Sequence, residues 1–409
     1  MQTLNQAFIQ KYRWSILAIG VLAQLTFATA FAGIPVAGVL LRQQYHFSTG
    51  ELGFVLGSMG LGVALSEIIW GILTDKLGDK VVLIAGLTLM GATFLAIAAA
   101  CVPRDGRQPG SLSLGLLLVT AGAVGGSINS ASGRAVMTWF QDGERGFAMS
   151  IRQTAIPVGG ALGSVLVPWL ASAHGFRGAF LALAALCLAT AVCVWRWLIE
   201  IAAPPAASAG AAPPSPLRSA AAWRIALAGA ALTVPQIAVL TFGAVFLSDQ
   251  QHLGMAAISA TLVLIQLGGG ALRILAGRHS DRHRNRRALM RRIGVAAGLA
   301  GIALGLLTQG QGYLVLALLV LTGLAGHAWH GLAYTEIAVM SSVRRAGTAL
   351  GMMGTTLFAA AFLTPSAIPF ALRAGSWSAV WIGVGLLALL AVPLLAPPAL
   401  SAAPAGRAA

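Results

Sequence analysis

Charged residues are scarce in this chain of 409 residues, because Asp, Glu, Lys and Arg together make up only 9% of it. Soluble domains carry about 25% charged residues, so this deficit excludes an ordinary soluble fold. Acidic residues are the scarcest: 11 Asp and Glu stand against 26 Lys and Arg. The three cysteines (Cys101, Cys187 and Cys193) have no metal-type spacing and predict no disulfide framework.

Sequence patterns for catalysis and metal binding are also missing. The chain contains no GxxxxGK[ST] loop, so we expect no ATP hydrolysis. It shows no paired carboxylates, nucleophile triad or metal cluster, so we expect no enzymatic activity and no cofactor. His327 and His330 stand at i, i+3, but no third ligand is spaced to complete a metal site.

Long apolar stretches are what the chain has instead, and hydrophobic residues make up 57% of it. The hydrocarbon core of a bilayer is about 30 Å thick, which a helix crosses with roughly 20 residues. The expected spans are 14–41, 50–73, 81–101, 112–140, 146–172, 177–198, 223–248, 255–276, 290–309, 313–341, 347–371 and 376–396. The first is too long for a cleaved signal peptide. The sequence therefore predicts an all-α polytopic membrane protein with twelve transmembrane helices.

Basic residues indicate how the chain is oriented. With the N-terminus inside, five Lys and Arg fall outside and three lie within helices, which leaves 18 of 26 in cytoplasmic segments. Cytoplasmic loops are enriched in Lys and Arg, so we expect both termini to be cytoplasmic, in a bacterial-type inner membrane. The net charge of +15 then reflects topology rather than nucleic-acid binding. The basic run over 278–292 is mainly a topology anchor, and contact with lipid phosphates is a compatible second interpretation.

A Pro/Ala-rich stretch divides the helices six and six. It contains APPAASAGAAPPSP, within residues 201–217, and is typical of an extended tether. We expect a first six-helix bundle over 1–200, a cytoplasmic linker over 201–221, a second bundle over 222–400 and a cytoplasmic tail over 401–409.

The two halves repeat one loop and its surroundings. GILTDKLGDK begins at Gly71 and GRHSDRHRNR at Gly277, so both read Gly, three residues, Asp and a basic residue at an offset of 206. At a second offset of 201, RGFAMSIRQT is similar to RAGTALGMMGT near Gly347, and Asn129 aligns with His330. Two parallel repeats are typical of transporters whose site lies at the repeat interface near the midplane.

GILTDKLGDK resembles the signature loop of the major facilitator superfamily, Gly-x-x-x-Asp-[Arg/Lys]-x-Gly-[Arg/Lys]-[Arg/Lys]. The match departs at Asp79, where the family prefers a basic residue, and the second copy lacks the later Gly. Twelve helices, the six-plus-six division and the doubled loop extend the resemblance over the whole chain. It implies alternating access, in which two bundles rock about a central cavity.

The repeated loop has two interpretations. Asp75 can accept hydrogen bonds from the N–H groups that open the next helix, which would make a capped turn. The alternative is a charge latch that locks one conformation and breaks in the other. The latch candidates from both halves are Gly71, Asp75, Lys76, Gly277, Asp281 and Arg282.

Charged side chains inside the spans are the next candidates, because a charge at the centre of a spanning helix costs about 2.5–3.5 kcal/mol. Glu67 lies on the small-residue face of its helix and is the leading candidate for the proton carrier. The alternative is that it forms a structural ion pair with a basic neighbour. Arg273 is its counterpart in the second half. It is suited to an anionic group of a solute, unless its side chain extends to the cytoplasmic surface.

Two arginines of the first half are also candidates. The family often carries an arginine in its fourth helix, which Arg134 resembles, and structural pairing with Asp75 or Glu67 is the alternative. For Arg152 we favour a position beside the cavity over an anchor at the helix start.

Uncharged polar residues complete the expected pathway. His327, His330 and Tyr334 share one helix face near mid-membrane and either line the cavity or bond neighbouring helices. The remaining polar candidates, for either role, are Gln24, Asn129, Gln236 and Gln266.

The lead hypothesis is a monomeric secondary active transporter that moves a small polar or anionic metabolite, coupled to protons. An exporter of a drug, siderophore or metabolite is the alternative, because TAIPVGGALG resembles the Pro/Gly-rich motif of exporting antiporters. A non-transporting membrane receptor is a remote alternative. The expected partners are the solute, protons and membrane lipids.

Overall fold

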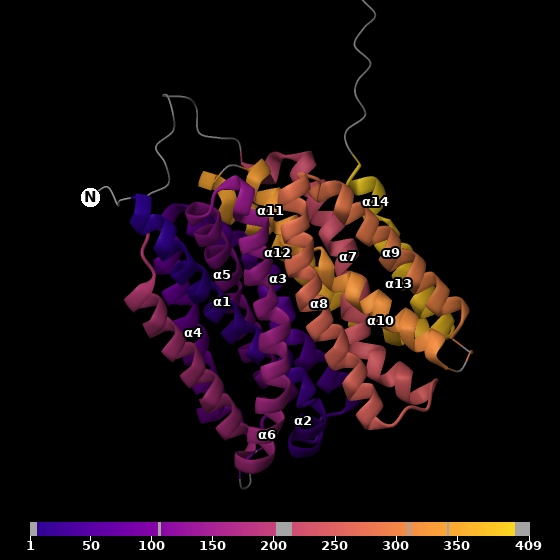
Figure 1. Ribbon diagram of the computed structural model, residues 1–409. Coiled ribbons are helices and arrows are strands. Elements are labelled where there is room, and N and C mark those ends of the chain that lie inside the picture. Colours follow the sequence, from indigo (N-terminus) through magenta and orange to yellow (C-terminus); the bar gives the residue numbers. More distant parts are fainter. Residues whose placement is uncertain are drawn as a thin grey trace, which may run out of the picture.

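The computed structural model describes residues 6–104, 108–201, 215–308, 310, 312–341 and 343–396. The regular elements of these residues are helices (Figure 1). They are α1 (Gln6–Val36), α2 (Gly38–Tyr45), α3 (Thr49–Leu77), α4 (Asp79–Ala100), α5 (Ser111–Trp139), α6 (Asp142–Trp197), α7 (Ala220–Asp249), α8 (Met255–His283), α9 (Arg286–Leu306), α10 (Tyr313–Ala328), α11 (His330–Met340), α12 (Ala346–Ala374), α13 (Trp377–Leu389) and α14 (Ala391–Leu394), with short 3-10 helices at Pro216–Arg218 and Val343–Arg345.

Within the described residues, eleven helical stretches are long and apolar enough to cross a membrane. One of them, α6, supplies two crossings, because its 56 residues would extend for about 84 Å at 1.5 Å per residue. It is interrupted at Gly175, whose φ of 67° is left-handed and favours glycine. Both ends of α6 return to the start of α1: Glu144 pairs with Arg13, and the carbonyl of Trp197 accepts from Tyr12 Oη at 2.7 Å. The prediction of twelve transmembrane helices is confirmed.

Some helix boundaries differ from the predicted ones. The predicted span 14–41 ends at Val36, and α2 follows as a separate helix. The predicted spans 313–341 and 376–396 are each broken, the first into α10 and α11 and the second into α13 and α14. Apolar residues continue on both sides of these breaks, so hydropathy gives no signal for them.

The two halves of the fold lie side by side, α1 to α6 in one and α7 to α14 in the other (Figure 1). Their most extensive contacts are between α3 and α12 and between α6 and α8, and α5 with α12 and α6 with α11 also meet. The first two contacts depend on glycine: a β-carbon on Gly71 would meet the backbone of Gly347, and one on Gly277 would lie 2.7 Å from the carbonyl oxygen of Gly146. These contacts are related by the two sequence offsets, so the repeat is also a repeat of packing.

The bundle boundaries stay predictions. Residues 202–214 of the expected linker and the expected tail over 401–409 lie outside the described residues. The described ends of the chain, at the start of α1 and at α14, lie at the same end of the molecule (Figure 1).

The outer surface of the helices is apolar. Leu65, Val165 and Leu306 are large hydrophobic side chains that stay exposed. Water would disfavour such a surface, whereas lipid tails accept it. Buried polar side chains, by contrast, gather between the two halves.

Sidedness is a testable prediction of this arrangement. Reporter fusions after Arg292 and after Gly310 should report opposite sides, cytoplasmic for the first, because α9 crosses the membrane between them. A control fusion after Leu253 should agree with the fusion after Gly310, since the side chain of Gln251 donates to the Gly310 carbonyl at 3.2 Å. Alkaline phosphatase and fluorescent-protein reporters measure this. The same side for Arg292 and Gly310 would contradict the topology.

Candidate functional site

Asp75 joins the two halves at one end of their interface. Its carboxylate accepts from the backbone N–H groups of Gly347 at 2.9 Å and Thr348 at 2.8 Å, and from Thr348 Oγ1 at 2.5 Å. These N–H groups open α12, where the helix dipole favours negative charge. The prediction that Asp75 caps the next helix along the chain is therefore wrong. That helix, α4, begins at Asp79, whose N–H donates to Glu200 Oε1 at 2.6 Å.

Arg134 is buried beside this cap. Its Nη1 donates to Asp79 Oδ1 at 2.8 Å, and its Nε lies 3.6 Å from Asp75 Oδ1. The pairing of Arg134 is thus with Asp75 and Asp79 rather than with Glu67. Asp79, where the loop departs from the family pattern, supplies the closer carboxylate. Sequence reasoning missed this role of Asp79, although its acidity in so apolar a chain was a usable signal.

Asp281 makes the corresponding contact from the second half. Its Oδ2 accepts from the N–H of Phe147, near the start of α6, at 2.7 Å. Its Oδ1 lies 3.2 Å from Arg286 Nη2, which is also 3.9 Å from Asp142 Oδ1. The loop aspartate of each half therefore accepts from backbone N–H groups near the start of a helix of the other half. We call the end of the molecule that carries Asp75 and Asp281 the latch end.

The six latch candidates do not all share in these contacts. Gly71, Asp75, Gly277 and Asp281 lie at the interface between the halves. Lys76 and Arg282 are exposed and form no ion pair with any described residue.

Glu67 is completely buried at the interface, further along α3. Its Oε1 accepts from Asn129 Nδ2 at 2.7 Å, and the same nitrogen lies 3.0 Å from the hydroxyl oxygen of Tyr334 in the second half. Its Oε2 has no hydrogen-bond partner. The absence of a side chain at Gly354 of α12 leaves the space that the carboxylate occupies. A single acidic group thus contacts both halves through one short polar chain.

Arg152 is also completely buried, and its hydrogen-bond partners are neutral groups. Its Nη2 donates to the Asn129 carbonyl at 2.6 Å, to Asn129 Oδ1 at 2.9 Å and to Gln24 Oε1 at 3.0 Å. Its Nε donates to Ser132 Oγ at 2.9 Å. The guanidinium lies inside the protein rather than anchoring the helix at the membrane surface, and it forms no ion pair with any described residue.

Arg273 is the buried guanidinium of the second half. Its Nε donates to the His327 carbonyl at 2.9 Å and its Nη1 to the Gln153 carbonyl at 2.5 Å, while Nη2 lies 3.2 Å from His327 Nδ1. With 0% of its surface exposed, the side chain does not extend to the membrane surface. Like Arg152, it forms no ion pair with a described residue.

Buried polar atoms without a partner accompany the two arginines in both halves. They are Gln24 Nε2, Glu67 Oε2, Gln153 Nε2 and Oε1, Gln236 Oε1, Gln266 Oε1, His327 Nε2 and Trp329 Nε1. An unsatisfied buried polar group costs about 1–3 kcal/mol, and native proteins contain few of them. Such a set indicates a place where a polar ligand or water completes the bonding. Sequence reasoning missed Trp329, although it stands between His327 and His330, which were already candidates.

The histidines of α10 and α11 belong to this polar interface. Gln236 Nε2 lies 3.3 Å from His327 Nδ1, and His330 Nδ1 lies 3.1 Å from the His327 carbonyl. The His330 ring stacks on Trp329 with 4.0 Å between ring centroids. In the part of the chain that the structure describes, no three His, Cys, Asp or Glu side chains are grouped to hold a metal ion.

Two bundles of helices with a polar interface inside an apolar exterior define an integral membrane transporter. The chain belongs to the Major Facilitator Superfamily, whose family model matches residues 18–365. The resemblance read from the loop is thereby confirmed, and so is the prediction that the chain is not an enzyme, because this is a family of transporters.

Relatives support the same conclusion. An uncharacterized MFS-type transporter of Mycobacterium tuberculosis is 30% identical over 95% of this chain and 86% of its own length. A probable sulfoacetate transporter of Cupriavidus necator is 30% identical over 44% of this chain and 40% of its own. A galacturonate transporter of Dickeya chrysanthemi is 28% identical over 46% and 52%. Among solved structures, the proton:xylose symporter XylE has a TM-score of 0.78 at 14% identity, covering 94% of this chain and 95% of its own, which shows a shared fold.

Proposed function

We propose that this transporter moves a small organic anion together with protons by alternating access. The observation that carries the proposal is the pair of completely buried arginines, Arg152 in the first half and Arg273 in the second, without a carboxylate partner among the described residues. A buried charge without a counter-ion is strongly unfavourable. An anionic solute between the halves would supply that counter-ion, and the guanidinium fork matches a carboxylate.

The surrounding groups favour a solute that carries hydroxyl or carbonyl oxygens besides its acid group. Unpaired amide nitrogens of Gln24 and Gln153 can donate, whereas the unpaired oxygens of Gln153, Gln236 and Gln266 can accept. The relatives named for sulfoacetate and galacturonate point to organic acids as well. We therefore propose a polar organic acid as the solute, with uptake as the direction.

Glu67 is the proposed proton carrier. Its free Oε2 is the site for the proton, and its Oε1 bonds Asn129, which also contacts Tyr334 and Arg152. A proton on the carboxylate removes a buried negative charge near Arg152, so protonation and anion binding would favour each other by charge compensation.

The two aspartate caps are the proposed latch, and we place the latch end at the cytoplasmic face. Asp75 and Asp281 each accept from N–H groups of the opposite half. Opening a path to that face requires the helices of the two halves to separate there, which breaks these bonds. Their strength therefore biases the equilibrium between the closed and open latch end.

The test is solute transport in right-side-out and inverted vesicles under an imposed pH gradient. Galacturonate and sulfoacetate serve as acidic probes, and xylose as a neutral control. We expect an acidic probe to accumulate in right-side-out vesicles only when protons can flow inward. Preferential transport of the neutral sugar, or accumulation indifferent to the pH gradient, would contradict the proposal. Accumulation confined to inverted vesicles would identify the exporter instead.

Arg273→Gln should raise the KM for the acidic solute about tenfold or more, since a hydrogen bond to a charged group contributes about 1.5–3 kcal/mol and every 1.4 kcal/mol is tenfold. Arg278→Gln is the control, because Arg278 lies on the same helix but is exposed. Initial rates against solute concentration, corrected for the amount of protein in the membrane, measure the effect. Unchanged KM in both variants would remove Arg273 from the solute site.

A further inference from the structure

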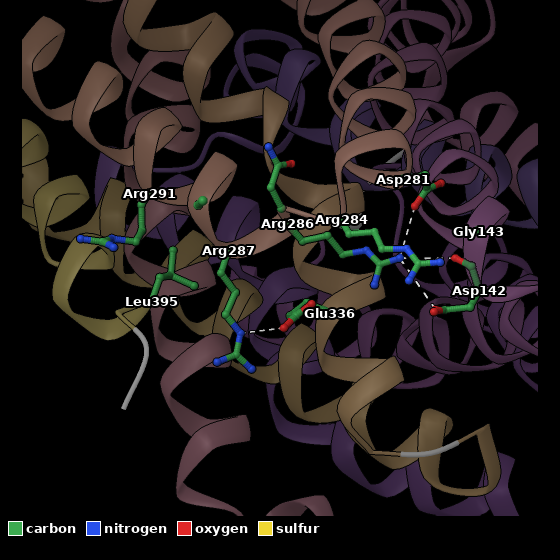
Figure 2. Close-up of a pocket in the computed structure, with 11 residues that line it drawn as sticks. Asp142, Gly143, Asp281, Arg284, Arg286, Arg287, Arg291, Glu336 and Leu395 are labelled. Atoms are coloured by element: carbon green, nitrogen blue, oxygen red, sulfur yellow. Dashed lines mark hydrogen bonds and ion pairs between the residues drawn. The ribbon is translucent and has the colours of Figure 1, made fainter. Parts of the chain in front are cut away.

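A polar cavity lies at the latch end, away from the buried side chains of Arg152 and Arg273. Its volume is about 580 Å³, within the usual range of small-molecule sites. Four arginines line it: Arg284, Arg286, Arg287 and Arg291 (Figure 2). They come from the end of α8 and the first turns of α9. Both lie within the basic run 278–292, for which the sequence predicts mainly the role of a topology anchor.

Two of these four arginines form ion pairs with acidic residues. Arg286 Nη2 lies 3.2 Å from Asp281 Oδ1 and 3.9 Å from Asp142 Oδ1, and Arg287 Nε lies 2.6 Å from Glu336 Oε1. Dashed lines in Figure 2 follow these contacts. Among the described residues that line the cavity, these three are acidic and four are arginines, so this lining keeps an excess of positive charge.

The other two arginines have no partner in the described part of the chain. Neither Arg284 nor Arg291 takes part in an ion pair or a side-chain hydrogen bond there, and Arg291 Nε is buried as well as unpaired. Arg284 ends α8 with a φ of 50°, a left-handed conformation that costs a residue other than glycine roughly 1–2 kcal/mol. The cavity therefore carries two guanidinium groups without an ion-pair partner among the described residues, Arg284 at an exposed position and Arg291 with its Nε buried.

We propose that this cavity binds a phosphate-bearing anion through Arg284 and Arg291. A guanidinium presents parallel N–H groups to phosphate oxygens. A phosphate monoester carries about −1.5 to −2 near neutral pH, so it would be attracted by two guanidinium groups that have no ion-pair partner. Asn285, the residue before α9, provides no side-chain cap, so the N–H groups that open this helix are further donors for phosphate.

Two sources can present this group. The cavity volume exceeds that of a phosphate ion, so the rest of the ligand is either a phosphorylated metabolite from solution or the headgroup of an anionic lipid. Both meet the same arginines, because loops that follow a spanning helix lie at the level of the lipid headgroups.

The experiment uses the purified full chain and two probes. In one arm, inorganic phosphate is titrated by calorimetry into protein in detergent, with sodium chloride at equal ionic strength as the reference. In the other arm, the protein is placed in nanodiscs of phosphatidylcholine with or without cardiolipin, and native mass spectrometry counts the lipid it retains. Saturable phosphate binding assigns the soluble source, and selective retention of cardiolipin assigns the lipid.

Paired variants separate a built site from general positive charge. Arg284→Gln with Arg291→Gln should weaken binding of the successful probe about tenfold or more, the equivalent of about 1.4 kcal/mol. The control joins Arg196→Gln with Arg292→Gln, which removes the same charge from positions outside the cavity lining, and should change binding less than about twofold.

The proposal is overturned if neither probe binds, or if both pairs weaken binding equally. Arg284 and Arg291 have no ion-pair or hydrogen-bond partners among the described residues, so we expect their variants to fold. Size-exclusion profiles check the folding of both variant pairs. Arg284→Lys with Arg291→Lys keeps the charge and should bind with intermediate strength. No transport is measured, so this test stands or falls independently of the proposed function.

Discussion

Glu67→Gln is expected to abolish accumulation of the solute against its gradient while solute exchange across the membrane continues. Glutamine keeps the shape of a protonated glutamate and can still bond Asn129, but it cannot release a proton. With one proton per solute, a gradient of one pH unit drives about tenfold accumulation, the equivalent of about 1.4 kcal/mol. The variant should fall to the equilibrium ratio of about one.

The measurement compares pH-driven accumulation with counterflow in reconstituted vesicles. Glu51→Gln is the matched control, because Glu51 lies on the same helix but is exposed at its first turn, and its glutamine can keep the capping bond. Undiminished pH-driven accumulation by Glu67→Gln would exclude Glu67 as carrier and direct attention to His327, His330 or Glu336. Loss of counterflow as well would indicate a structural rather than a coupling role.

The second large effect is expected at the contact between α3 and α12. Gly71→Leu should insert normally into the membrane and lose most of its transport. A β-carbon at this position already meets the Gly347 carbonyl and lies 3.0 Å from Thr348 Cα, so a leucine forces the two helices apart at the latch end. Initial uptake rates, corrected for protein in the membrane, measure the loss.

Gly53→Leu on the same helix is the control for Gly71→Leu, because nothing lies within 4 Å of a β-carbon there. Asp75→Asn tests the same latch through charge, since it weakens three hydrogen bonds to the start of α12 and removes the attraction to the helix dipole. It should also lose most transport. Full activity in both Gly71→Leu and Asp75→Asn would contradict the proposal that these residues form a conformational latch.

The interface shows where sequence reasoning reached its limit. The helix faces that carry Glu67 and Arg273 could be read from periodicity, since a helix places i, i+3 and i+4 on one side. The sequence could not show whether Arg273 extends to the membrane surface or stays inside the protein, because a long flexible side chain can adopt either position. The structure buries it against the carbonyls of Gln153 and His327. The position of the Arg273 side chain therefore depends on how the neighbouring helices pack.

The sequence by itself determined the twelve spans, the exclusion of a soluble fold and the doubled loop. Each of these depends on residues close together in the chain: apolar runs long enough for the bilayer, and a short motif that recurs at one offset. Only the tertiary structure decided which groups meet. Asp75 accepts from Gly347 at the start of α12, 272 residues later, and Asn129 contacts Tyr334 across 205 residues. Such pairs form where the two halves of the fold pack together, and no local pattern records the relative placement of the halves.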